Sequence, residues 1–169
     1  GLEPSKPFRE YAISKMGIAA ENIALSSVAK AEYEANSFDF ISFGAVLEHL
    51  YDPSDCLKKA LSWVKPGGLI QVEVPSADWL ISKLVNCYYR LMFTDYVTNL
   101  SPMHNPFHLY EFTLKSFQEN GKLNGYAIPF HQYFVCKTFL PKAFDTLLRT
   151  YMKRTNSGME LEVWLRKLA

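Results

Sequence analysis

The stretch that most constrains the fold runs from residue 37 to residue 74, where two apolar runs flank a helical pattern and a glycine turn. Residues 38–43 form a short, nearly continuous apolar run, which is typical of a parallel strand covered on both faces. Asp52 and Pro53 then predict the start of a helix, as an N-cap residue followed by proline at the first helical position. The first half of the stretch therefore indicates a strand, a loop and a helix.

The second half of this stretch ends the helix and begins another strand. Apolar residues at helical spacing predict one buried stripe: Cys56, Leu57, Ala60, Leu61 and Val64. Pro66 prevents the helix from continuing, and Gly67 and Gly68 allow a turn with positive φ. Residues 69–74 then indicate the second strand. Two strands joined by such a helix form a right-handed βαβ unit.

Size and composition limit the classes of protein to consider. A chain of 169 residues suits one domain, and 49% hydrophobic and 15% aromatic residues argue against disorder. A formal net charge of +1 gives no reason to expect a nucleic acid partner. Cys56, Cys87 and Cys136 show neither metal-ligand spacing nor a disulfide framework, so we expect no metal site and a cytoplasmic location. No apolar run is long enough to span a bilayer.

The central stretch also resembles a known family. FDFISFGAVLEHLYDP (38–53) and VKPGGLIQVEVP (64–75), at this separation, are similar to the middle of class I S-adenosylmethionine-dependent methyltransferases, closest to the quinone-biosynthesis and small-molecule group. The resemblance implies an α/β fold: a Rossmann-like, mostly parallel sheet with an antiparallel C-terminal strand and helices on both faces. It extends over nearly the whole chain, so we expect residues 1–169 to form one domain, with residues 76–107 as the lid and acceptor segment.

The resemblance assigns the first cofactor contacts near the N-terminus. Glu3 matches the acidic residue that hydrogen-bonds the ribose hydroxyls of S-adenosylmethionine, and a carboxylate can accept bonds from two vicinal hydroxyls. Ala31 and Glu32 match the loop that borders the adenine ring, although Lys30 stands where the family usually has an acidic residue. The alternative is that Glu3 and Glu32 are ordinary surface residues.

Further cofactor contacts follow the first strand of the central stretch. By resemblance, Phe43, Gly44 and Ala45 touch the methionine part of the cofactor. Ligands of open α/β sheets bind beyond the carboxyl ends of the strands, and glycine lets the backbone approach a ligand closely. Glu48 and His49 form the family's EH pair. His49 either faces the cofactor or supports packing between the loop and the helix.

The segment after the second strand is rich in aromatic residues. An amphipathic helix is predicted to open near residue 76, and a proline-broken loop covers residues 101–106. The apolar side chains either belong to the core or form a lid over a flat or apolar acceptor. His108 lies in residues 107–113, which resemble the family's H-x-x-x-F-T element. A histidine there either acts as a catalytic base toward the acceptor or hydrogen-bonds the lid.

The remaining elements complete the expected sheet and its helices. We expect a helix between Ser5 and Gly17, a strand over 23–28, a helix from Thr113 to Asn120-Gly121, an edge strand over 126–135 with Pro129, a helix opened by Pro141, and a last strand over 159–165. In the resembled family this last, antiparallel strand lies between the fifth and sixth strands.

The family's first strand and glycine-rich loop have no counterpart, since no G-x-G precedes Glu3. We therefore expect an N-terminally incomplete sheet, with an upstream region or a partner chain, such as a second copy in a homodimer, at the gap. The leading hypothesis is an enzyme that transfers a methyl group from S-adenosylmethionine to an O, N or C atom of a small molecule. The alternatives are a non-catalytic binding module and a nicotinamide-dependent oxidoreductase, and the KPGG turn argues against the latter.

Overall fold

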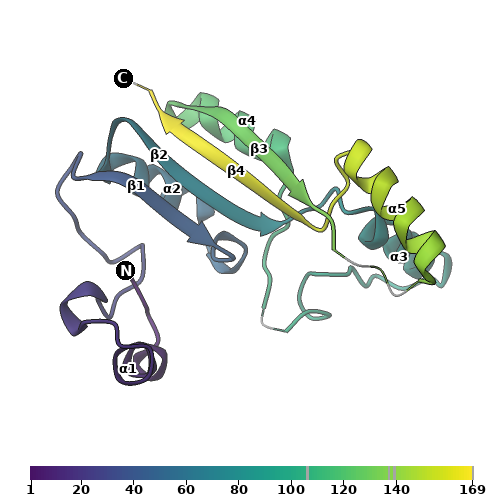
Figure 1. Cartoon of the computed structure of the whole chain (residues 1–169), viewed down its shortest axis with the longest axis horizontal. Coiled ribbons are helices and arrows are strands. Elements are labelled where there is room, and N and C mark those ends of the chain that lie inside the picture. Colours follow the sequence, from purple (N-terminus) through teal and green to yellow (C-terminus); the bar gives the residue numbers. More distant parts are fainter. Residues whose placement is uncertain (106, 137, 139, 169) are drawn as a thin grey trace.

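The computed structural model describes residues 1–168 except 106, 137 and 139. Its four-stranded sheet has the order β1-β2-β4-β3 (Figure 1). The strands are β1 (Phe38–Gly44), β2 (Val64–Pro75), β3 (Tyr126–Phe134) and β4 (Glu160–Lys167). β1 and β2 are parallel, and β4 is antiparallel to both β2 and β3. Three strands thus share one direction, and the last strand lies between its two neighbours as predicted.

The helices alternate with the strands along the chain. They are α1 (Lys6–Ser14), η1 (Ala20–Asn22), η2 (Leu47–His49), α2 (Pro53–Trp63), α3 (Leu80–Leu91), α4 (Leu114–Asn124) and α5 (Lys142–Arg154). Asp52 caps α2 by accepting a hydrogen bond from the Asp55 N–H at 2.9 Å, as the sequence predicts. None of the helices in the described ranges combines the length and apolar character that crossing a bilayer demands.

The hydrophobic core lies between the sheet and the two helices α2 and α4. Alternate residues of the two central strands are almost completely buried: Ile70, Val72, Val74, Leu161, Val163 and Leu165. The predicted helical stripe is also buried, but only its first four residues, Cys56, Leu57, Ala60 and Leu61, lie on α2. Val64 begins β2, which starts earlier than the predicted strand over 69–74. On α4, Phe117 is buried, and its carbonyl oxygen accepts a hydrogen bond from the Tyr126 hydroxyl at 2.8 Å. This layer fixes β1 and β2 side by side, and their carboxyl ends form one edge of the core.

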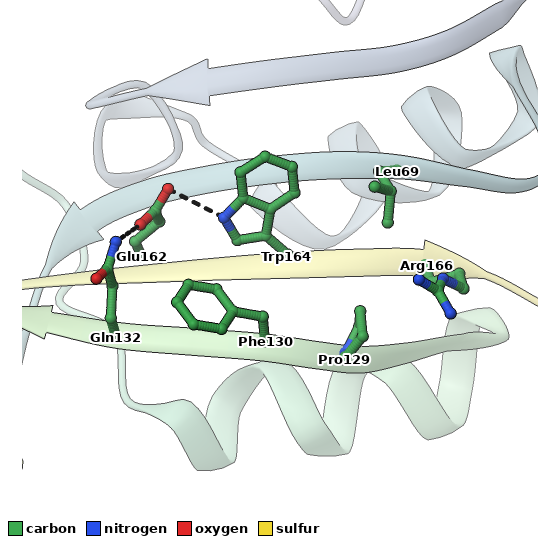
Figure 2. Close-up of a pocket in the computed structure, with 7 residues that line it drawn as sticks. All are labelled: Leu69, Pro129, Phe130, Gln132, Glu162, Trp164 and Arg166. Atoms are coloured by element: carbon green, nitrogen blue, oxygen red, sulfur yellow. Dashed lines mark hydrogen bonds between the residues drawn. The ribbon is translucent and has the colours of Figure 1, made fainter.

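The opposite face of the sheet is open. No helix of the described residues lies along it in Figure 1, whereas α2 and α4 pack on the other face. Figure 2 shows Trp164 and Phe130 on this face, and Phe130 is 50% exposed. Glu162 accepts hydrogen bonds from Gln71, Gln132 and the Trp164 indole. Burial raises the pKa of Glu162, but these hydrogen bonds outweigh burial and lower the pKa overall, so the carboxylate is ionised at neutral pH.

The predicted strand over residues 23–28 is not formed. A single parallel bridge joins Leu2 to Ala24, supported by the hydrogen bond from the Glu3 N–H to the Ala24 carbonyl oxygen at 3.0 Å. The Ser26 N–H donates a hydrogen bond to the same Ala24 oxygen, so the chain turns there and the extended conformation ends. The bridge is separate from the four-stranded sheet, and an isolated pair of extended segments is only marginally stable.

The helix after β2 begins later than the sequence predicts, at Leu80 instead of near residue 76. Ser76 pairs with Phe112 in an isolated parallel bridge, and the Ser76 hydroxyl oxygen accepts a hydrogen bond from the Asp78 N–H at 3.1 Å. These contacts keep the backbone extended and then turned, so helical geometry starts only afterwards.

The helix predicted to end at Asn120-Gly121 continues to Asn124. Gly125, with φ of 76°, terminates it, whereas Gly121 is a packing contact. A Cβ atom at Gly121 would lie 2.7 Å from the Tyr126 carbonyl oxygen, so glycine is needed there for close approach to β3. β3 is an edge strand, and its register with β4 shifts around Pro129, as predicted for proline in a sheet.

Candidate functional site

The carboxyl ends of β1 and β2 form the rim of the candidate site. Gly44 is paired with Glu73 there, and the Ala45 N–H donates to the Glu73 carbonyl oxygen at 2.9 Å. Ala45 has φ of 50°, a left-handed conformation that costs a non-glycine residue about 1–2 kcal/mol and turns the chain into η2. A Cβ atom built on Gly44 meets no atom within 4 Å. The rim beside Gly44 is therefore open.

Three histidine rings gather near this rim. The ring centroids of His49, in η2, and His108, in the loop before α4, are 4.7 Å apart. The ring of His104 stacks on that of His108 with a centroid distance of 3.9 Å. The Leu109 N–H donates to the Glu48 carbonyl oxygen at 2.8 Å, which fixes the loop against η2. Segments far apart in the sequence thus supply one site.

A pocket of about 270 Å³ lies between these histidines and the strand ends, lined in part by Ala45, Glu48, His49, Glu73, His108 and Glu160. Burial lowers the pKa of His108, and the neighbouring His104 and His49 lower it further, so the His108 ring is neutral at neutral pH. Burial raises the pKa of Glu48. Burial and a hydrogen bond with Glu73 raise the pKa of Glu160. The pocket combines a neutral imidazole base with closely spaced carboxyl groups.

A second pocket, of about 310 Å³, lies between β1 and the N-terminal segment. Its lining includes Leu2, Val28, Tyr33, Phe43 and Val46. Leu2 directly precedes Glu3. Val28 and Tyr33 flank residues 31 and 32. The pocket therefore joins the three segments that the resemblance assigns to the cofactor.

The candidate cofactor residues differ in their surroundings. Glu3 Oε1 accepts a hydrogen bond from the Ser5 N–H at 2.7 Å, which fixes a half-buried carboxylate at the start of α1. Ala31 is 6% exposed and belongs to the hydrophobic core. Glu32 is exposed and forms an ion pair with the Lys59 ammonium at 2.9 Å. These three residues lie on segments whose neighbouring residues line the second pocket, whereas Gly44 and His49 belong to the rim.

The apolar residues of the lid segment do not pack in the core. Leu84, Tyr88 and Leu91 of α3 are 58%, 57% and 71% exposed, and Phe93 is 97% exposed. The core alternative for these residues is therefore wrong, and a role as a lid stays a prediction. Pro106, within the expected loop over 101–106, lies outside the described residues.

Sequence reasoning gave Glu48 no role, although the structure makes its side chain a central feature of the site. Glu48 is 1% exposed, and its Oε2 is buried without a hydrogen-bond partner among the described residues. The EH pair was a visible signal. The approach of Glu48 to His108, however, depends on a long-range loop contact that no local pattern reveals.

Comparisons with known proteins give two kinds of likeness. Residues 4–129 match a family model described as a methyltransferase domain. An S-adenosylmethionine-dependent methyltransferase from Archaeoglobus fulgidus superposes with a TM-score of 0.64 and 14% identity, covering 99% of this chain and 75% of that one. A methyltransferase of the same kind from Methanosarcina mazei superposes with a TM-score of 0.67 and 16% identity, covering 99% of this chain and 81% of that one. Another, from Mesorhizobium loti, superposes with a TM-score of 0.63 and 15% identity, covering 99% of this chain and 79% of that one.

Proposed function

The chain belongs to the methyltransferase domain family, and from this premise we propose that it transfers a methyl group from S-adenosylmethionine to a small-molecule acceptor. The observation that carries the proposal is the open rim at Gly44, with His108 beside it, at the carboxyl ends of the parallel strands β1 and β2. This end of an α/β sheet is the usual ligand position. The bound cofactor supplies a methyl group on a positively charged sulfur, so the protein has mainly to provide proximity and alignment.

The residues present fit such a cofactor. The pocket between β1 and the N-terminal segment has apolar and aromatic walls, including Val28 and Tyr33, which suit a flat purine ring. The Glu3 carboxylate uses one oxygen for the Ser5 N–H and has further acceptor capacity for ribose hydroxyls. Gly44 leaves space for the methionine part. We propose these roles for Glu3 and Gly44, with Ala31 acting through its backbone.

The acceptor would bind in the pocket of about 270 Å³ next to His49 and His108. That volume lies just below the usual range of about 300–1,000 Å³ for small-molecule sites, which favours a small acceptor over a macromolecular one. The exposed aromatic side chains of residues 76–107 would then close over the acceptor and exclude water.

His108 is placed to act on the acceptor. His108 Nδ1 lies 3.0 Å from the Asn99 carbonyl oxygen, which can only accept, so Nδ1 carries the proton in the neutral ring. Nε2 therefore has the free lone pair. A base at this position would take a proton from an oxygen or nitrogen acceptor, a contribution of about 10²- to 10⁴-fold in rate.

The proposal is tested by following methyl transfer directly. The protein is incubated with S-adenosylmethionine carrying an isotopic label in the methyl group and with a cell extract, and label is counted in the fraction that passes a small-pore filter after the unreacted cofactor has been removed from it by chromatography. We expect label in that fraction, and we expect His108→Ala to lower its rate of appearance at least about 100-fold while cofactor affinity changes less than about twofold.

The matched control is His131→Ala, which removes a histidine from β3, outside the candidate site, and should leave the rate unchanged. Label retained only by protein or nucleic acid would contradict a small-molecule acceptor. An unchanged rate in His108→Ala would remove His108 from the mechanism.

Two further expectations accompany this function. The three cysteines are free, with Cys56 buried and Cys87 and Cys136 exposed, which supports a reducing, cytoplasmic setting. A homodimer stays a prediction.

A further inference from the structure

One group of side chains at the site has a chemistry that methyl transfer alone does not require. Glu48 and His49 come from η2, and His108 comes from the loop before α4. Each offers one potential ligand atom, and these atoms all lie within 4.8 Å of one another. A carboxylate and two imidazoles form the ligand set that catalytic sites of divalent transition metals use, with further positions left open for water or substrate.

The carboxylate of Glu48 is the strongest single observation. The residue is 1% exposed, and its Oε2 is buried with no hydrogen-bond partner in the described part of the chain. A buried polar atom left without a partner is costly, and a carboxylate oxygen more so. Its Oε1 lies 3.9 Å from His49 Nε2, too far for a hydrogen bond. The carboxylate therefore has an unsatisfied oxygen at the pocket that His49 and His108 also line.

The two imidazoles are oriented as metal ligands usually are. His49 Nδ1 lies 2.8 Å from the Phe107 carbonyl oxygen, and His108 Nδ1 lies 3.0 Å from the Asn99 carbonyl oxygen. Because a carbonyl oxygen only accepts, each neutral ring has its proton on Nδ1 and its lone pair on Nε2. A backbone carbonyl that holds the second ring nitrogen is the usual outer-shell support of a ligating histidine.

The surroundings favour a cation. Glu73 and Glu160 line the same pocket as Glu48, and no lysine or arginine is among its described lining residues. Several carboxyl groups with low exposure repel one another unless a positive charge is shared among them. Tetrahedral ligands at about 2.1 Å from an ion are about 3.4 Å apart, so closure from 4.8 Å needs only side-chain adjustments of about 1 Å.

We propose that Glu48, His49 and His108 bind one divalent transition-metal ion, such as Zn²⁺, at the carboxyl end of β1. The sequence had predicted no metal, because that expectation considered only the spacing of cysteines. The site does not depend on methyl transfer. If the proposed function also holds, the ion would polarise an acceptor oxygen in the same pocket, and His108 would act through the ion instead of taking the proton itself.

The test uses Co²⁺ as a spectroscopic probe for the intact chain after treatment with a chelator. We expect one Co²⁺ per chain, visible d–d bands of a nitrogen and oxygen site, and no thiolate charge-transfer band from the three cysteines. Glu48→Gln and His49→Gln should each weaken binding at least about tenfold. Two controls should bind Co²⁺ as the parent does: His131→Ala, and Glu162→Gln, which alters a buried carboxylate outside the cluster.

Circular dichroism of each metal-free variant establishes that it is folded, and His49→Gln keeps the test informative if Glu48→Gln unfolds, because His49 is partly exposed. The proposal is overturned if Co²⁺ binds no more tightly than about 1 mM, if folded Glu48→Gln or His49→Gln binds as the parent does, or if the spectrum shows cysteine ligation. Since the readout is metal binding, failure of methyl transfer would leave its result intact.

Discussion

Gly44→Val is expected to weaken the binding of S-adenosylmethionine at least about tenfold while leaving the stability of the protein within about 0.5 kcal/mol. A Cβ atom at this position meets nothing within 4 Å in the free protein, so we expect the added side chain to enter open space without disturbing the strand. They would occupy the space beside Ala45 that the proposed methionine part of the cofactor requires. Affinity is measured by calorimetric titration and stability by urea unfolding.

A graded series and a distant control make this prediction specific. Gly44→Ala should weaken binding less than Gly44→Val, since it fills less of the space. Ala127→Val adds similar bulk to an exposed position of β3 and should leave affinity unchanged. Equal affinity in Gly44→Val and the parent would show that the cofactor does not lie against this rim.

Gly158→Ala is expected to destabilise the fold by about 1–3 kcal/mol, the range for a side chain forced into a filled space. A Cβ atom there would overlap the Phe134 carbonyl oxygen and lie 3.1 Å from the Tyr133 Cβ atom, and backbone atoms cannot rotate away. The neighbouring Met159 N–H donates to the same Phe134 oxygen at 2.8 Å, so the clash also strains the pairing of β3 and β4. Urea unfolding measures the loss.

Gly44→Ala serves again as the matched control, because its Cβ atom enters open space. The difference in unfolding free energy between the two glycine variants isolates the packing term from the general effect of replacing glycine. Gly158→Ala with the stability of the parent would mean that the turn before β4 is not packed against β3 as the structure shows.

The central βαβ unit could be predicted because its signals are local. Asp52 and Pro53 fix the start of α2, and the buried stripe follows from helical spacing. The helix ends at Trp63, earlier than predicted, because Val64 already pairs in β2. The place of β4 between β2 and β3 came from the family resemblance, and the structure confirms it. Pro129 marked an edge strand because its missing N–H cannot serve a central one.

The features that were missed depend on partners distant in the sequence. Phe40 was read as part of a strand covered on both faces, yet it is 47% exposed, because the helices that pack along the sheet lie on its other face. Residues 23–28 have strand-like composition, but among the residues that the structure describes their one backbone bridge is that of Ala24 to Leu2. Strand formation needs neighbours that composition does not specify.

Some features of the candidate site could likewise be predicted from local signals in the sequence, and others could not. The positions of Gly44 at the end of β1 and of His49 after it could be predicted from the strand end and the EH pair. The contact of His49 with His108, and the buried carboxylate of Glu48 beside them, could not be, because a long-range loop contact brings them together.

Calorimetric titration of S-adenosylmethionine, with NADH as the competing candidate, tests the central claim most directly. It is made on this chain and on a version lengthened upstream. We predict that S-adenosylmethionine binds with one site per chain, that the demethylated product competes with it, and that NADH does not bind. Binding of NADH without any binding of S-adenosylmethionine, in both versions, would contradict the account.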